Sequence, residues 1–311
     1  MRVNRHALFC MIGWSTVTLS LLLATAACAQ VTVTISGNQA LAQISLPLTV
    51  GTVDGDVTIT FDSPSNLTAQ ELNLSASVIT NPTDPTLLAR LPACAPTCVW
   101  IDPTFPLLIT VEPLAVPWLY HSGFEADETD PGLLGFANTY EIEIHTPDLD
   151  CTAPAVGQSC PATIYRLFKA PISGDFQDYT DDVLKGSVRA RGRDGAFSQF
   201  LIVADTRASI DVEPGKELLL DARINSASLS TALRDDLLGK LAQVQDAALN
   251  HLDYTAAIGY LDALIAEVQA NAGTAIANQW SADHSLVNDA GEIEGLAQTL
   301  HYTLLRLQAG N

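Results

Sequence analysis

The chain has 311 residues, of which 48% are hydrophobic and only 16% are charged. This composition excludes a disordered protein, and the length is enough for more than one folding unit. Acidic residues are in excess, with 35 Asp and Glu against 15 Lys and Arg and a net charge of −20. Such a chain is repelled at long range by phosphate backbones and anionic lipids, so nucleic acid binding is excluded as a general role.

The first 29 residues have the pattern of an export signal. Two arginines precede an apolar stretch, and small residues end it at Ala29. We predict a signal peptide over residues 1–29 with cleavage between Ala29 and Gln30. Two alternatives stay open, a lipoprotein lipidated at Cys28 and an uncleaved membrane anchor. No later run reaches the roughly 18 apolar residues that a membrane span needs.

Two of the six cysteines fall in the predicted leader. The four that remain are Cys94, Cys98, Cys151 and Cys160. An even number of cysteines in an exported protein predicts two disulfides. Three pairings are possible, and the short separations make neighbour with neighbour the simplest. A zinc site is the alternative, although the chain has no histidine at ligand spacing.

Residues 30–207 alternate between apolar and polar side chains in short runs separated by turn residues. The runs start near Val31, Ala40, Val57, Leu72 and Tyr140. One apolar and one polar face per strand is typical of antiparallel sheets packed on each other. A last hairpin is predicted over residues 184–204, with Asp194 and Gly195 as its tight turn. We therefore predict a mainly antiparallel β-sandwich with immunoglobulin-like layering.

After residue 229 the apolar residues recur at helical spacing. Stripes over residues 229–248, 254–268 and 286–304 predict a small all-α domain of about three amphipathic helices. Ser230 and Asp253 stand where N-caps belong. The connections are short, so neighbouring helices should be antiparallel.

Part of the helical region resembles the FIMAH-type helical module, which is found toward the C-termini of bacterial extracellular proteins. The resemblance covers residues 230–308 and rests on the aliphatic spacing of 247–257 and 261–276, which ends in Gly-x-x-Ile. It implies a packed helical domain on an extracellular protein. This chain has Leu264 where the module usually has Phe and Thr274 where it usually has Lys. No ligand-binding residue is carried over.

The whole layout, with segments 165–171 and 197–205 ahead of the helices, is also similar to an uncharacterised family of secreted bacterial proteins. That family implies an architecture and no activity, cofactor or site residue. The predicted divisions are a signal peptide at 1–29, a β-sandwich at 30–207, a linker at 208–229 and a helical domain at 230–308.

The sequence contains no signature of a catalytic or nucleotide-binding site. The G-x-S-x-G elbow, the P-loop and the dinucleotide-binding glycine pattern are all missing. His145 falls on the polar face of a predicted strand, and the other histidines after the leader are scattered. We therefore predict no enzyme activity and no cofactor, with surface or packing roles for the histidines.

Two groups of acidic residues have the composition of extracellular calcium loops. They are Glu125, Asp127, Glu128 and Asp130, and then Asp175, Asp178, Asp181 and Asp182. Neither follows the order of an EF-hand loop, so we predict solvated acidic loops and no metal ligand. A calcium site is the alternative.

The chain has one local excess of positive charge and one group of aromatic residues that a ligand could use. The basic residues are Lys185, Arg189, Arg191 and Arg193, which odd spacing places on one face of a strand. This row predicts either an anionic-ligand site or cross-strand pairs with Glu141 and Glu143. The aromatic residues are Trp100, Trp118, Tyr120 and Phe124, which indicate either a sugar-stacking platform or core.

These patterns lead to a primary functional hypothesis and two alternatives. The primary hypothesis is a non-catalytic protein of the periplasm or extracellular space, in which the sandwich binds an envelope or extracellular protein or glycan and the helices serve as a docking or spacer domain. The first alternative is a secreted hydrolase that uses the acidic loops, with or without calcium. The second is a purely structural lipoprotein anchored through Cys28.

Overall fold

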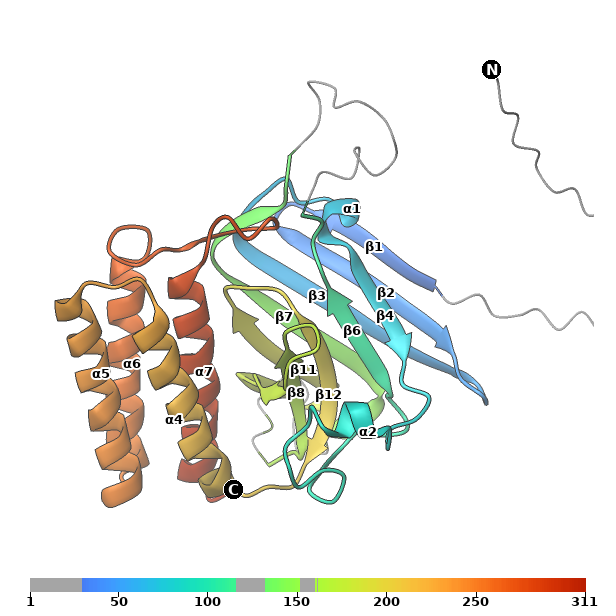
Figure 1. The fold of residues 1–311 in the computed structure, drawn as a ribbon. Coiled ribbons are helices and arrows are strands. Elements are labelled where there is room, and N and C mark those ends of the chain that lie inside the picture. The colour runs from blue at the N-terminus through green and yellow to red at the C-terminus, as the bar shows by residue number, and fades with distance from the viewer. Residues whose placement is uncertain (1–29, 116–131, 152–159, 161) are drawn as a thin grey trace, which may run out of the picture.

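The computed structural model describes residues 30–115, 132–151, 160 and 162–311. Two antiparallel sheets pack on each other, and a group of helices lies beside them (Figure 1). This confirms the predicted fold class. The leader with Cys28, the first acidic group, and three of the aromatic residues lie outside the described residues; those three are Trp118, Tyr120 and Phe124.

Sheet A has seven strands among the described residues. In spatial order they are β1 (Gln30–Ser36), β2 (Gln39–Pro47), β3 (Thr52–Ser65), β7 (Gly135–Cys151), β11 (Gly186–Asp194) and β10 (Asp182–Leu184), with β13 (Gln279–Ser281) paired to the start of β7. The first hairpin turns at Gly37, whose φ of 60° is the left-handed conformation that glycine favours. The alternating runs that start near Val31 and Ala40 are therefore the two strands of one hairpin.

Sheet B has six strands within the described ranges. In spatial order they are β4 (Leu74–Val78), β6 (Leu107–Val111), β12 (Gln199–Asp205), β8 (Tyr165–Ala170) and β9 (Gln177–Asp178), with β5 (Val99–Trp100) paired to the end of β12. The short helices α1 (Ala69–Leu72) and α2 (Pro85–Leu88) lie in the connections before β4 and β5.

The two sheets bury the apolar faces that the alternation predicts. On β3 and β7, Ile59 pairs with Ile142 and Phe61 with Tyr140, and all four side chains are at most 1% exposed. Each such aliphatic or aromatic side chain contributes about 1.5–3 kcal/mol on burial. The intervening residues face outward, so the outer face of sheet A is polar.

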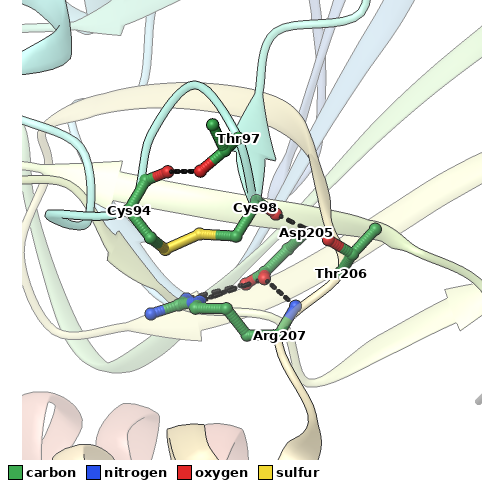
Figure 2. Close-up of a disulfide and its surroundings, with 6 residues drawn as sticks. All are labelled: Cys94, Thr97, Cys98, Asp205, Thr206 and Arg207. Atoms are coloured by element: carbon green, nitrogen blue, oxygen red, sulfur yellow. Dashed lines mark hydrogen bonds and ion pairs between the residues drawn. A yellow bond between two sulfur atoms is a disulfide. The ribbon is translucent and has the colours of Figure 1, made fainter.

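Both disulfides join the cysteines that are neighbours in sequence. Figure 2 shows that the Cys94–Cys98 loop is tied to the end of β12, because the backbone N and Oγ1 of Thr206 donate to the Cys98 carbonyl at 2.9 and 3.1 Å. Arg207 there forms an ion pair with Asp205 at 2.7 Å. The second disulfide, Cys151–Cys160, connects the end of β7 to the chain before β8.

The described helical region has four long helices and one π-helical turn. They are α4 (Ser209–Ser226), α5 (Thr231–Gln245), η1 (Asp246–Asn250), α6 (Tyr254–Asn271) and α7 (Asp289–Gln308). Ser230 and Asp253 cap α5 and α6 as predicted. None of the described helices is both long enough and apolar enough to cross a membrane.

Helix α4 occupies the segment predicted as a linker, which corrects that prediction. Its buried face includes Glu213, Lys216 and Glu217 beside Leu220 and Ile224. Charged residues on the buried face remove the apolar stripe by which an amphipathic helix is recognised. The pattern therefore failed to indicate a helix.

The hairpin predicted over residues 184–204 is also wrong. Strand β11 belongs to sheet A and β12 to sheet B, so the chain crosses between the sheets at this point. Asp194 is 1% exposed and forms an ion pair with Lys169 of β8. Gly195 lies directly under α7. The dipeptide serves a buried ion pair and a close helix contact instead of a tight turn.

We expect Gly195→Ala to lower the free energy of unfolding by roughly 1–3 kcal/mol, because overpacking forces the backbone to shift. A Cβ there would lie 2.6 Å from the Glu292 backbone N and 2.7 Å from the Asn288 carbonyl O. The matched control is Gly239→Ala on α5, where a Cβ meets nothing within 4 Å. It should raise stability by about 0.5–1 kcal/mol. Urea unfolding of wild type and both variants tests this. Equal free energies of unfolding for wild type and Gly195→Ala would contradict the close packing at Gly195.

Candidate functional site

The outer face of sheet A carries rows of polar side chains that cross three strands. Asp56 of β3, His145 of β7 and Arg189 of β11 form one row in the strand register. The next rows run from Thr58 through Glu143 to Arg191 and from Thr60 through Glu141 to Arg193. Side chains directly opposite on neighbouring strands lie close enough to interact. This face therefore has a fixed pattern of acid, imidazole and guanidinium groups.

The predicted basic row is largely engaged with carboxylates. Glu143 accepts from Arg189 at 2.9 Å and from Arg191 at 2.7 Å, and Arg193 Nε donates to Asp181 at 3.0 Å. Burial alone would raise the pKa of Glu143, but the two arginines lower it below its ordinary value. Lys185 lies between β10 and β11 and is not part of the row. The arginines thus have the cross-strand carboxylate partners of the second interpretation.

His145 lies between an acid and a hydroxyl. Its Nε2 is 2.8 Å from Ser187 Oγ, and its Nδ1 is 3.3 Å from Asp56 Oδ2. The side chain of His145 is 17% exposed and that of Asp56 is 42% exposed, while Ser187 is half-buried. A carboxylate can only accept, so in the neutral imidazole the Nδ1 proton faces Asp56 and Nε2 accepts from the serine hydroxyl.

A depression of about 360 Å³ begins at this histidine and extends over β3, β2 and β1. The polar side chains that line it are Thr32, Gln43, Ser45, Asp54, Asp56 and His145. Asp54 is exposed and Asp56 is half-buried. The depression therefore offers carboxylate, hydroxyl, amide and imidazole groups, and among the described residues no Phe, Tyr or Trp side chain lines it.

The second acidic group does not assemble into one site. Asp178 is buried against Lys216 of α4, with 2.8 Å between its Oδ2 and the lysine Nζ, and Asp181 is bound to Arg193. Burial would raise the pKa of Asp178, but Lys216 and Arg166 lower it. Burial raises the pKa of Asp181 to about 6 despite Arg193. Within the described residues no three His, Cys, Asp or Glu side chains gather as a metal site would require.

Buried charges also join the helices to the sandwich. Lys216 Nζ donates to the carbonyl and hydroxyl oxygens of Thr299 on α7 at 3.0 and 2.6 Å, and the Thr299 hydroxyl donates to the Asp178 carbonyl at 3.0 Å. Arg223 of α4 forms ion pairs with Asp289 and Glu292 of α7 at 2.5 and 2.8 Å. The Arg223 pairs therefore join α4 to α7, while Thr299 and Lys216 join these helices to Asp178 of the sandwich.

A pair of carboxyl groups is buried on α4. Glu213 is fully buried and Glu217, one turn later, is 2% exposed. Burial, followed by the neighbouring Glu213 carboxyl, raises the pKa of Glu217 to about 9, and burial also raises the pKa of Glu213. Glu217 therefore keeps its proton at neutral pH, so the pair carries at most one negative charge there.

The fold and this site define a two-sheet protein with an attached helical region and a polar outer face. Residues 17–308 match a family of unknown function, DUF6689, and the chain belongs to that family. No curated protein and no solved structure matches the chain. The match covers most of the chain and includes both the sandwich and the helices.

The sequence placed His145 on an exposed strand face but missed its two partners. Asp56 and Ser187 are 89 and 42 residues away from His145, and only the strand register brings them together. A signal existed in the alternation, which puts Asp56 on the outer face of its strand. Nothing in the sequence indicated that β3, β7 and β11 are neighbours.

We expect Glu217→Gln to change how stability depends on pH. The unfolded chain ionises Glu217 near its ordinary pKa, so the folded protein holds an extra proton from there up to about pH 9 and loses stability as pH rises across this window. The amide removes this loss, so the variant should gain about 1–3 kcal/mol over wild type between pH 5 and pH 8.

Urea unfolding of Glu217→Gln and wild type at about pH 5 and about pH 8 measures this effect. Asp235→Asn, which removes an exposed carboxylate from α5, is the matched control and should leave the pH dependence unchanged. If the free energy of unfolding changed with pH equally in Glu217→Gln and wild type, Glu217 would be ionised in the folded protein.

Proposed function

We propose that the protein is exported and acts as a binding protein, with the polar depression on sheet A as its ligand site. The arginines in the leader, the small residues before Gln30 and the two disulfides support export to an oxidising compartment. The family match supports neither a location nor an activity, because the family's function is unknown.

The lining of the depression carries the proposal and limits the ligand. Asp54 and Asp56 lie along one side, and a net charge of −20 surrounds them, so an anionic ligand is disfavoured. Hydroxyl and amide groups from Thr32, Gln43 and Ser45 can bind the hydroxyl groups of a ligand. We infer a neutral, polyhydroxylated ligand, such as the glycan part of an envelope or extracellular component.

The helices support the sandwich instead of serving as a spacer in this proposal. Helix α4 reaches sheet B through the ion pair of Lys216 with Asp178, and α7 approaches β11 closely at Gly195. Removing one partner of such a buried pair leaves an uncompensated charge and costs roughly 3–5 kcal/mol. We propose that residues 230–308 pack like the FIMAH-type helical module, and we assign no ligand to them.

We expect the natively expressed protein to begin at Gln30 and to be four hydrogen atoms lighter before reduction than after it, because it contains two disulfides. Intact-mass measurement with and without a reductant, on soluble and membrane fractions, tests this. Acyl chains on Cys28 in the membrane fraction would instead establish a lipoprotein. A mass that does not change on reduction would contradict the two disulfides.

We expect binding to the depression to depend on Asp54. A glycan array probed with the full chain identifies a ligand, and titration of Asp54→Asn should then give a dissociation constant raised at least about tenfold, as expected for a lost hydrogen bond to a charged group. Asp235→Asn removes one exposed carboxylate on α5 and should bind as wild type does. No glycan binding, or equal loss in both variants, would contradict the site.

A further inference from the structure

We propose that Ser187, His145 and Asp56 form a catalytic triad that cleaves an acyl ester. The proposal goes beyond binding and rests on the proposed function in one respect, namely that the depression beside His145 holds the rest of the substrate. Its chemistry depends only on the three side chains. The three residues come from three different strands, so no local sequence pattern indicates the triad.

The atoms are connected in the order that nucleophilic catalysis requires. Ser187 Oγ is 2.8 Å from Nε2 and the carboxylate of Asp56 is 3.3 Å from Nδ1, so acid and serine contact different ring nitrogens of His145. Asp56 fixes the tautomer in which Nε2 is free to accept the serine proton. The triad is recognised by this geometry and by the roles of its members, whatever the fold or the chain order.

An irregularity in the strand pairing brings the serine to the imidazole. Ser187 pairs with Asp150 while Arg189, two residues on, pairs with His145, so the register shifts between them. The extra residues of β7 lie between these pairs and include Pro147, which has no N–H for the ladder. Bulges of this kind redirect side chains and are common beside active sites. Here the shift lets Ser187 reach across to His145.

The reacting groups are also accessible. Ser187 is half-buried and the side chain of Asp56 is 42% exposed, so part of each residue faces solvent. His145 is held more tightly, with a side chain only 17% exposed between its two partners. Asp56 and His145 line the depression of about 360 Å³, which extends from these two residues across β2 to β1. Ser187 does not line it, but the serine hydroxyl is 2.8 Å from His145 Nε2. A small acyl group at Ser187 would thus be attached to a hydroxylated body lying in the depression.

The reaction has two balanced steps. Ser187 Oγ attacks the ester carbonyl carbon while its proton passes to His145 Nε2, and the C–O bond to the alcohol breaks as His145 returns that proton to the leaving oxygen. Water then attacks the acyl-serine with His145 again taking a proton, which releases the acid and restores the serine. Short-chain O-acyl esters of polyhydroxylated compounds are the substrate class that fits the polar lining.

A fluorophosphonate probe tests the nucleophile independently of any natural ligand, because the small probe reacts at the serine itself. The full-length mature protein should be labelled at Ser187, with a new P–O bond and loss of fluoride, and peptide mass spectrometry should locate the adduct. Ser187→Ala should abolish labelling, while Ser77→Ala, an exposed serine on β4, should leave it unchanged. Circular dichroism and thermal unfolding confirm that each variant is folded.

The other two residues have graded effects. His145→Gln should slow labelling about 100-fold or more, and Asp56→Asn should slow it less, as expected for a base and for the group that orients it. Hydrolysis of p-nitrophenyl acetate should follow the same order of variants.

An unlabelled wild type, or equal labelling of wild type and a folded His145→Gln variant, would overturn the triad. Labelling with no glycan binding would overturn the proposed binding function and leave the nucleophile intact. Glycan binding without labelling would overturn the triad and leave the proposed binding function intact.

Discussion

Two buried ion pairs determine how the sheets and helices of this molecule are arranged. Lys169 of β8 meets Asp194 of β11 between the two sheets, and Lys216 of α4 meets Asp178 of β9 at the helices. All four side chains are at most 9% exposed. Such pairs add little net stability over apolar packing, but a wrong arrangement would leave a bare charge in the interior. They therefore select one position of the sheets and helices over other compact arrangements, and the polar outer face of sheet A depends on that selection.

The outer face of sheet A shows how the same kind of pairing works near solvent. Arg189 and Arg191 both contact Glu143, so this carboxylate offsets part of the positive charge of the two arginines beside His145. Exposed pairs of this kind contribute little energy, about 0–1 kcal/mol each. Their effect is positional, because they hold β7 and β11 side chains in fixed directions on one side of the register shift. Asp56 and His145 line the depression at the end of this ordered row, and Ser187 contacts the imidazole of His145 there.

Local patterns predicted the parts of the fold that depend on alternation. Burial of Ile142 and Ile144 beside outward Glu143, the cap at Ser230, and the pairing of Cys94 with Cys98 follow from residues close in sequence. Helix α4 and the crossover at Asp194 could not be predicted, because each buries charges whose partners lie far away along the chain. The candidate site could not be predicted from the sequence for the same reason. Three ordinary polar residues on three strands acquire meaning only from a register that no local pattern encodes.

The pairing of β13 with β7 affects the order in which the chain can fold. Residues 279–281 lie between α6 and α7, yet they complete sheet A by pairing with residues 135–137. Trp280 of that strand stacks on Phe136, so the sandwich core includes a side chain from the last part of the sequence. A contact of such high sequence separation forms slowly. Sheet A therefore stays incomplete, with an open edge at the start of β7, until almost the whole chain has been synthesised.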